Sequence, residues 1–247
     1  MFIKVKGLVL RETEYKDSDK ILTILTDSEG LLTVRAWGVK RKSSPIKSGC
    51  QLLAFSEFTV EERNGFRKVT EAVPLELFSP LRSDIELLSL ASYFSQSAEV
   101  LAQEDLPDPR LMPLLLYAFH ALCKGRRKEL VKAAFELRLA VLAGYEPDLN
   151  PCSRCGSGES QSFNVTLGTL DCACNPESSF GTLRMPMSQG CHQAMEYIVS
   201  CEERKLFSFT LGDQSLKELS GIAETYLLTR LERGFSTLDF YKSLLLT

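Results

Sequence analysis

Four cysteines lie close together in the segment "PCSRCGSGESQSFNVTLGTLDCACNP". The first two form a C-x-x-C pair, and the last two form a C-x-C pair after a gap of sixteen residues. Thiolates at the first spacing can share one tetrahedral metal ion, and a hairpin between the two pairs would bring up the remaining ligands. The segment therefore predicts a structural Zn²⁺ site. Its expected ligands are Cys152, Cys155, Cys172 and Cys174.

The second pair leaves the ligand set open, because C-x-C is a tighter spacing than C-x-x-C. One of its cysteines could yield its place to Cys191 or His192 downstream. A redox dithiol is an alternative, but it would leave the second pair unexplained and would lie outside the strand-to-helix context of such motifs. A zinc deaminase needs an upstream H-x-E motif, which neither of the two histidines provides, so that alternative fails. Structural thiols without metal are the remaining alternative.

A second group of residues with clear chemistry is the segment "RAWGVKRKSSPIKSG", residues 35–49. It holds five basic side chains and no carboxylate, in a chain whose net charge is -3. Its Gly, Ser and Pro residues exclude a helix or a regular strand. Such a loop can follow the phosphates of a nucleic acid, with released counterions supplying the affinity; simple solvation is the alternative. The expected DNA-binding residues are Arg35, Lys40, Arg41, Lys42 and Lys47.

Other candidates are weaker. Tyr15 and Trp37 could stack on unpaired bases, but Trp37 follows a strand pattern, which favours burial in the core. His120 lies in the apolar run "LMPLLLYAFHALC" and is expected to be a hydrogen-bonded core residue. The basic group "KGRRKELVK", residues 124–132, opens a helix, where its charge opposes the helix dipole. A solvated helix face is favoured there over a second DNA-binding surface.

The elements that must position these residues begin with strands. The runs "IKVKGLVLRET", "KILTILTD" and "LLTVRAWG" are β-branched and partly alternating, and "EFTVEERNGFRKVTEAV" carries Asn64-Gly65 between two alternating runs, which is a strong hairpin signal. Five strands in the first eighty residues, without a helical period, are typical of an OB-fold barrel. The basic segment then lies in the longest loop of the barrel.

From Ser79-Pro80 onward the period becomes helical, with a serine cap and proline at the first position of a helix that continues through "LRSDIELLSLASYFSQSAEVLAQ". Further helices are predicted in "RLMPLLLYAFHALC", "RKELVKAAFELRLAVLAGY", "SQGCHQAMEYIVSCEERK" and "DQSLKELSGIAETYLLTRLERG". The fold class is therefore α+β and multidomain. The expected parts are an OB-fold barrel over 1–79, a helical domain over 80–148 and 177–247, and a zinc-finger-like insertion over 149–176.

Composition limits the function. The chain is 44% apolar and 25% charged, which is typical of an ordered globular protein. Its N-terminus lacks the apolar block of a signal peptide, and its most apolar run is too short to cross a bilayer, so we expect a cytoplasmic protein without a membrane partner. No nucleophile-base pair, glycine-rich phosphate loop or carboxylate pair emerges, so a binding factor is expected and not an enzyme.

Four stretches together resemble one known family over nearly the whole chain. They are "KGLVLRETEYKDSDKILTILTDSEGLLTVRAWGVKRKSS", "PLELFSPLRSDIELLSLASYFSQ", "FELRLAVLAGYEPDLNPCSRCG" and "AETYLLTRLERGFSTLDFYKSL". The chain resembles the RecO family of bacterial recombination mediators. The resemblance implies an OB-fold, a helical domain and a zinc-finger element.

The resemblance also implies binding of single- and double-stranded DNA, annealing of complementary strands, and partnership with RecR and single-strand DNA-binding protein in loading RecA recombinase, in the cytoplasm at the nucleoid. By position, residues 35–47 match the basic OB-fold loop of the family, and Cys152 and Cys155 match its first zinc knuckle. The family usually shows C-x-x-C where this chain has Cys172-Ala173-Cys174. A zinc-containing protein adaptor that does not bind DNA is the alternative function.

Overall fold

The structure is a computed structural model that describes residues 1–151, 162–171, 174 and 181–246. It divides the chain into two compact units. The first unit comprises Met1–Cys123 together with Phe235–Thr247, and the second comprises Lys124–Gly234. Within the described residues, no helix is long and apolar enough to cross a membrane.

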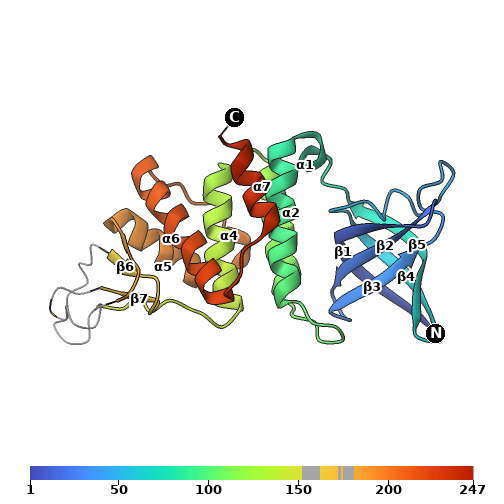
Figure 1. The fold of residues 1–247 in the computed structure, drawn as a ribbon, viewed down its shortest axis with the longest axis horizontal. Coiled ribbons are helices and arrows are strands. Elements are labelled where there is room, and N and C mark those ends of the chain that lie inside the picture. The colour runs from blue at the N-terminus through green and yellow to red at the C-terminus, as the bar shows by residue number, and fades with distance from the viewer. Residues whose placement is uncertain (152–161, 172–173, 175–180, 247) are drawn as a thin grey trace. The chain divides into compact units, whose positions relative to one another are not determined.

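The first unit begins with a closed five-stranded barrel, drawn in blue to cyan in Figure 1. Its strands are β1 (Phe2–Tyr15), β2 (Asp19–Thr26), β3 (Leu31–Ala36), β4 (Phe55–Arg63) and β5 (Phe66–Glu76). The strand order is β1-β2-β3-β5-β4, and the long β1 closes the barrel because it pairs with both β2 and β4. The prediction of five strands in a barrel of the OB type is confirmed.

Alternation of side chains explains the core of the barrel. Along β3, Leu32, Val34 and Ala36 are buried, whereas the residues between them face outward. The turn between β4 and β5 contains Asn64 and Gly65 with φ values of 51° and 74°. Both residues have the left-handed conformation that a tight type I′ hairpin requires, so the hairpin prediction is confirmed.

The helices of the first unit differ in two respects from the prediction. They are α1 (Ser79–Ser83), α2 (Ile85–Leu101), α3 (Leu111–Cys123) and α7 (Ser236–Leu244). One continuous helix was expected after Ser79, but the chain breaks at Asp84, whose carboxylate accepts hydrogen bonds from the backbone N–H groups of Glu86 (2.8 Å) and Leu87 (3.1 Å). Asp84 is therefore the cap of a new helix. The residue that precedes α1 is Phe78, so the expectation that Ser79 is the cap was wrong.

Helix α7 was not predicted separately, and it packs beside α2 in the same unit (Figure 1). The rings of Phe235 and Tyr93 meet edge to face at 5.5 Å, and the Thr237 hydroxyl donates to the side-chain oxygen of Gln96 at 2.5 Å. On α3 the prediction for His120 was wrong, because this residue is exposed. The buried residues of α3 recur at intervals of three and four positions and form one face of the helix, and position 120 lies outside this face.

The second unit contains the remaining helices and a small sheet. Its elements are α4 (Lys128–Leu142), β6 (Ser162–Asn164), β7 (Thr169–Leu170), β8 (Arg184–Pro186), α5 (Gln189–Ser200), η2 (Glu203–Lys205) and α6 (Asp213–Leu231). The predicted end of α4 is confirmed: Gly144 has φ 89°, its N–H bonds to Val141 O, and the N–H of Tyr145 bonds to Ala140 O. The predicted hairpin between the cysteine pairs is also confirmed by β6 and β7, whereas β8, which pairs with β6, was missed.

Candidate nucleic-acid interface

The basic segment leaves β3 as a series of turns. Its backbone forms short-range hydrogen bonds, such as Arg41 N to Gly38 O at 3.1 Å and Lys47 N to Ser44 O at 3.3 Å. Two apolar side chains of the segment, Val39 and Ile46, enter the core of the barrel, and so does Cys50 directly after it. The prediction that the segment is neither helix nor strand is confirmed from Trp37 onward, but it was wrong for Arg35 and Ala36, which belong to β3. The turns are fastened to the barrel at several points, and this holds the polar residues between the anchors at the surface.

The first turn of the segment is held by Ser18 and Asp19, where β2 begins. A carboxylate oxygen of Asp19 accepts the backbone N–H of Gly38 at 2.8 Å, and Ser18 O accepts the N–H of Lys40 at 3.0 Å. The hydrogen bond from Gly38 lowers the pKa of the Asp19 carboxyl. Gly38 has φ 64°, a conformation that glycine adopts without strain. Asp19 therefore sets the direction in which the basic segment leaves the barrel.

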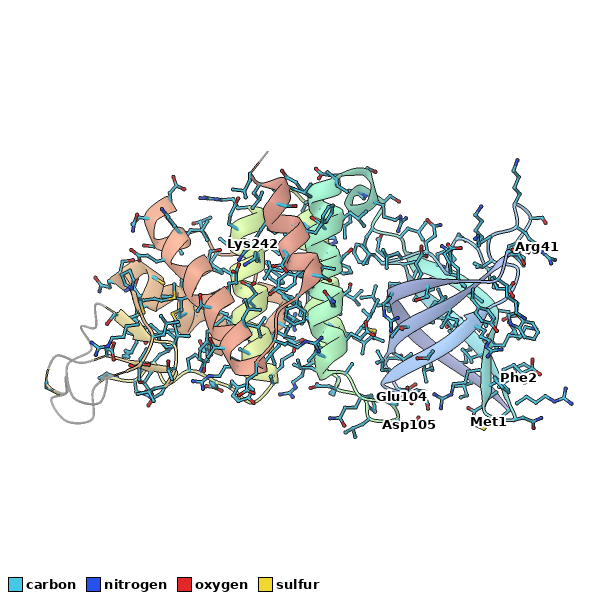
Figure 2. The ribbon with its side chains drawn as sticks, in the orientation of Figure 1. Met1, Phe2, Arg41, Glu104, Asp105 and Lys242 are labelled. Carbon is cyan, nitrogen blue, oxygen red and sulfur yellow. The ribbon has the colours of Figure 1, made fainter. Side chains whose placement is uncertain are left out.

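Four of the five predicted DNA-binding side chains are exposed in this segment; they are Lys40, Arg41, Lys42 and Lys47. Figure 2 shows Arg41 at the end of the barrel, pointing into solvent. Lys40 forms an ion pair with Glu14 on β1, and the hydrogen bond from this lysine lowers the pKa of the Glu14 carboxyl. Within the described residues, Arg41, Lys42 and Lys47 take part in no ion pair, so their charge faces solvent.

The fifth predicted residue, Arg35, lies on the outward face of β3. Its guanidinium lies over the rings of Tyr15 and Phe66, with its carbon 5.3 Å and 4.8 Å from the two ring centroids. Arg35 therefore belongs to the surface of the strands and is separate from the turns. The sequence reasoning did not single out Phe66, although its position beside the Asn-Gly turn could have placed it at this end of the barrel.

The expectation that Trp37 is a core residue was wrong. Its side chain is 52% exposed, and the ammonium nitrogen of Lys68 lies 4.6 Å from its ring centroid. The reason is the alternation of β3: Val34 and Ala36 point inward, so position 37, directly after the strand, points outward. The sequence shows the same alternation, which predicts that position 37 faces outward.

The second basic group is not collected into one surface. Lys132 is buried, with its nitrogen 2.8 Å from Glu136 Oε1 and 2.7 Å from Glu224 Oε2. Arg126 donates to Phe209 O at 2.6 Å, and Arg127 pairs with Asp213 at 2.8 Å. These three cations make contacts within the second unit, which a nucleic acid would have to break. Lys124 is exposed, and Lys128 is half-buried.

Of the predicted zinc ligands, Cys152, Cys155 and Cys172 lie outside the described residues, and Cys174 is exposed. The hairpin between the two pairs is described: Asp171 N donates to Ser162 O at 3.1 Å. Ser162 and Asp171 therefore lie at the same end of the hairpin. The first cysteine pair precedes Ser162 in the sequence, and the second pair follows Asp171.

The two alternative ligands lie on α5. Cys191 is fully buried, and burial raises the pKa of its thiol to about 12. His192 has its Nε2 3.2 Å from Leu149 O and 3.6 Å from Glu196 Oε1. The histidine therefore lies next to the chain that leads into the first cysteine pair, whereas the cysteine faces the interior of the second unit.

The barrel and the helices that follow it define the chain as a multidomain protein built on an OB-type barrel with exposed basic turns. Residues 1–78 match the family described as Recombination protein O N terminal, and residues 82–239 match Recombination protein O C terminal. The chain belongs to the RecO family.

Relatives match along the whole chain. It is 31% identical over 246 residues to a protein named DNA repair protein RecO from Acetivibrio thermocellus, with 98% of this chain and 97% of the relative covered. A protein of the same name from Heliobacterium modesticaldum is 29% identical, with 96% and 89% covered. Another from Alkaliphilus metalliredigens is 26% identical, with 99% and 100% covered.

Proposed function

We propose that this protein is a DNA-binding recombination mediator, which binds single- and double-stranded DNA, anneals complementary strands and helps to load RecA recombinase during repair. The observation that carries the proposal is the exposed basic surface of Arg41, Lys42 and Lys47, anchored to an OB-type barrel by the buried Val39 and Ile46. Membership of the RecO family supports the same conclusion.

The mechanism follows from charge neutralisation. Each cation that meets a phosphate releases counterions, so a strand gains affinity without base recognition. Two strands bound on one basic surface repel each other less, and complementary bases can then meet. Lys40 joins this surface when a phosphate replaces the carboxylate of Glu14 as its partner.

Partners complete the proposed role. RecR and single-strand DNA-binding protein are the proposed protein partners, with DNA held at the barrel. We also propose a structural Zn²⁺ ion bound by Cys152, Cys155, Cys172 and Cys174. The hairpin of β6 and β7 supports this ligand set, because both cysteine pairs connect to the same end of the hairpin. Thiolates in a four-ligand set leave no open position, so the ion would stabilise the fold and take no part in chemistry.

Salt-dependent binding tests the proposal. A labelled single-stranded oligonucleotide is titrated with the protein, and fluorescence anisotropy is measured at several salt concentrations. If the four basic residues of the turns, Lys40, Arg41, Lys42 and Lys47, each neutralise one phosphate, log affinity falls with log salt at a slope of roughly -2.8. Changing Lys40, Arg41 and Lys42 to alanine should reduce the slope to roughly -0.7 and slow strand annealing.

A matched control changes three exposed basic residues of the second unit, Lys124, Arg204 and Lys205, to alanine. This control alters the net charge by the same amount and should keep the wild-type slope. Equal slopes for both triple variants would remove the basic turns from the mechanism. If no strand binds saturably even at low salt, the protein is instead an adaptor whose barrel binds a protein partner.

A further inference from the structure

A pocket of about 510 Å³ opens on the barrel beside the contact between β3 and β5. These two strands are joined through the parallel pair of Arg35 and Lys68. Around the pocket, Thr33 and Arg35 come from β3, and Phe66 and Arg67 come from β5. Glu104 lines the pocket from the loop after α2, which pairs with Gly30 of the barrel in the same unit (Figure 2).

Aromatic rings and planar cations gather at this pocket. The ring of Phe66 is 59% exposed, and the Arg35 guanidinium lies over it and over Tyr15. Trp37 lies next to this group, since Lys68, the β-sheet partner of Arg35, covers its ring. A guanidinium stacked on a ring offers a flat surface of the same kind as the ring itself.

The two arginines of the pocket have different partners. Arg67 pairs with Glu62 at 3.3 Å and with Asp105 at 3.4 Å. Arg35 takes part in no ion pair among the described residues, so its N–H groups are available to a ligand. The ionisable side chains that line the pocket are two arginines and two glutamates, Glu62 and Glu104. Because these charges balance, the pocket suits an uncharged flat group better than a phosphate.

We propose that this pocket, with the rings of Tyr15, Trp37 and Phe66, binds unpaired nucleobases of a single strand. Stacking on an aromatic ring needs a free base face, which a paired and stacked duplex does not present. The basic turns hold phosphates of either form of DNA, and the pocket adds affinity for single strands alone. The pocket therefore determines the preference of the protein for single-stranded over duplex DNA. This inference rests on the proposed function, because both require that the protein binds nucleic acid.

The single tryptophan of the chain makes this site directly observable. Trp37 fluorescence is recorded while the full-length protein is titrated with three probes of equal length: a single-stranded oligonucleotide, the same strand with abasic sites throughout, and a duplex. The single strand should quench the fluorescence and bind more tightly than the abasic strand, which carries the same phosphates. The duplex should bind without quenching.

Two variants separate the stacking surface from the charge. Phe66→Leu removes an exposed ring and should weaken single-strand binding by on the order of tenfold, with duplex binding changed less than twofold. Arg35→Lys keeps the charge but loses the planar group, so it should keep the salt slope and weaken single-strand binding. The control is Tyr117→Leu on α3, which removes a ring that is 41% exposed on a helix outside the barrel strands, and this variant should bind like the wild type.

The outcomes are distinct. If the abasic and normal strands bind equally and Phe66→Leu has no effect, the base site is refuted while the phosphate-binding function stands. If none of the three probes binds saturably, both the base site and the proposed function are refuted. The site is supported if the single strand alone quenches the fluorescence, if Phe66→Leu needs about tenfold more single strand for the same quenching, and if Tyr117→Leu behaves like the wild type.

Discussion

Replacing Lys132 by methionine should strongly destabilise the second unit. The ammonium group of Lys132, on α4, lies between two carboxylates, that of Glu136 one turn further along α4 and that of Glu224 on α6. Lys132 is 4% exposed and Glu136 is fully buried, whereas the side chain of Glu224 is 18% exposed. Methionine fills a similar volume but removes the cation that these carboxylates share.

The magnitude follows from the burial of these groups. Removing one partner of a buried ion pair typically costs 3–5 kcal/mol. The partial exposure of Glu224 lets water solvate one of the carboxylates, so we expect a loss of about 3 kcal/mol, at the lower end of that range. The assay is urea unfolding at pH 7 followed by circular dichroism, with the change in unfolding free energy taken from the midpoint and the slope.

The pH dependence gives a second readout. Burial alone lowers the pKa of Lys132, but the two carboxylates outweigh burial and raise it above 10.5. The stabilisation by this cation is therefore present below pH 10.5 and is lost as the pH rises further. In the methionine variant the carboxylates take up protons on acidification, so the loss measured at pH 7 should shrink toward pH 5.

Two further variants complete the test. Glu136→Gln in the Lys132→Met background removes one uncompensated charge and should recover part of the loss. Lys124→Met changes an exposed lysine close by and should alter stability by less than about 0.5 kcal/mol. A loss below about 1 kcal/mol, or a loss of equal size at pH 5 and pH 7, would refute the argument that this lysine compensates buried charge.

Three other changes have defined outcomes. Glu14→Gln removes the ion-pair partner of Lys40 and should tighten single-strand binding in low salt, and this difference should vanish in high salt. Unchanged affinity in low salt would show that the Glu14–Lys40 pair does not compete with DNA. Burial raises the pKa of the Cys50 thiol from 9.0 to about 12, so the free energy of unfolding should fall as the pH rises above 9. Urea unfolding at pH 10.5 measures this loss, and Cys50→Ala should remove about 2 kcal/mol of it. Cys152→Ser should lower bound zinc and thermal stability together, and an unchanged zinc content by mass spectrometry would exclude Cys152 as a ligand.

Local patterns in the sequence were sufficient for most of the barrel. The alternation of Leu32, Val34 and Ala36 and the Asn64-Gly65 turn depend on residues that are neighbours along the chain, and both were predicted correctly. The same holds for the end of α4 at Gly144. The break at Asp84 was also a local signal, but it was overlooked because the apolar period continues through it.

The candidate site was predicted only in part. Charge and composition identified the basic segment, and its turns lie on the surface as expected. The placement of Arg35 over Tyr15 and Phe66 joins residues from three different strands, and it depends on how the barrel closes. Trp37 was misassigned because its place beside a strand pattern suggested burial, whereas its position in the alternation of that strand points it outward.

The sequence by itself determined the kinds of element, their order and the charges that they carry, because period, turn chemistry and composition act over a few residues. Only the tertiary structure decided which distant residues meet. Lys132 finds Glu224 on another helix, and Arg35 stands beside Lys68 where the barrel closes. The physical reason is that such contacts arise from the packing of whole elements, and no local preference of the chain specifies that packing.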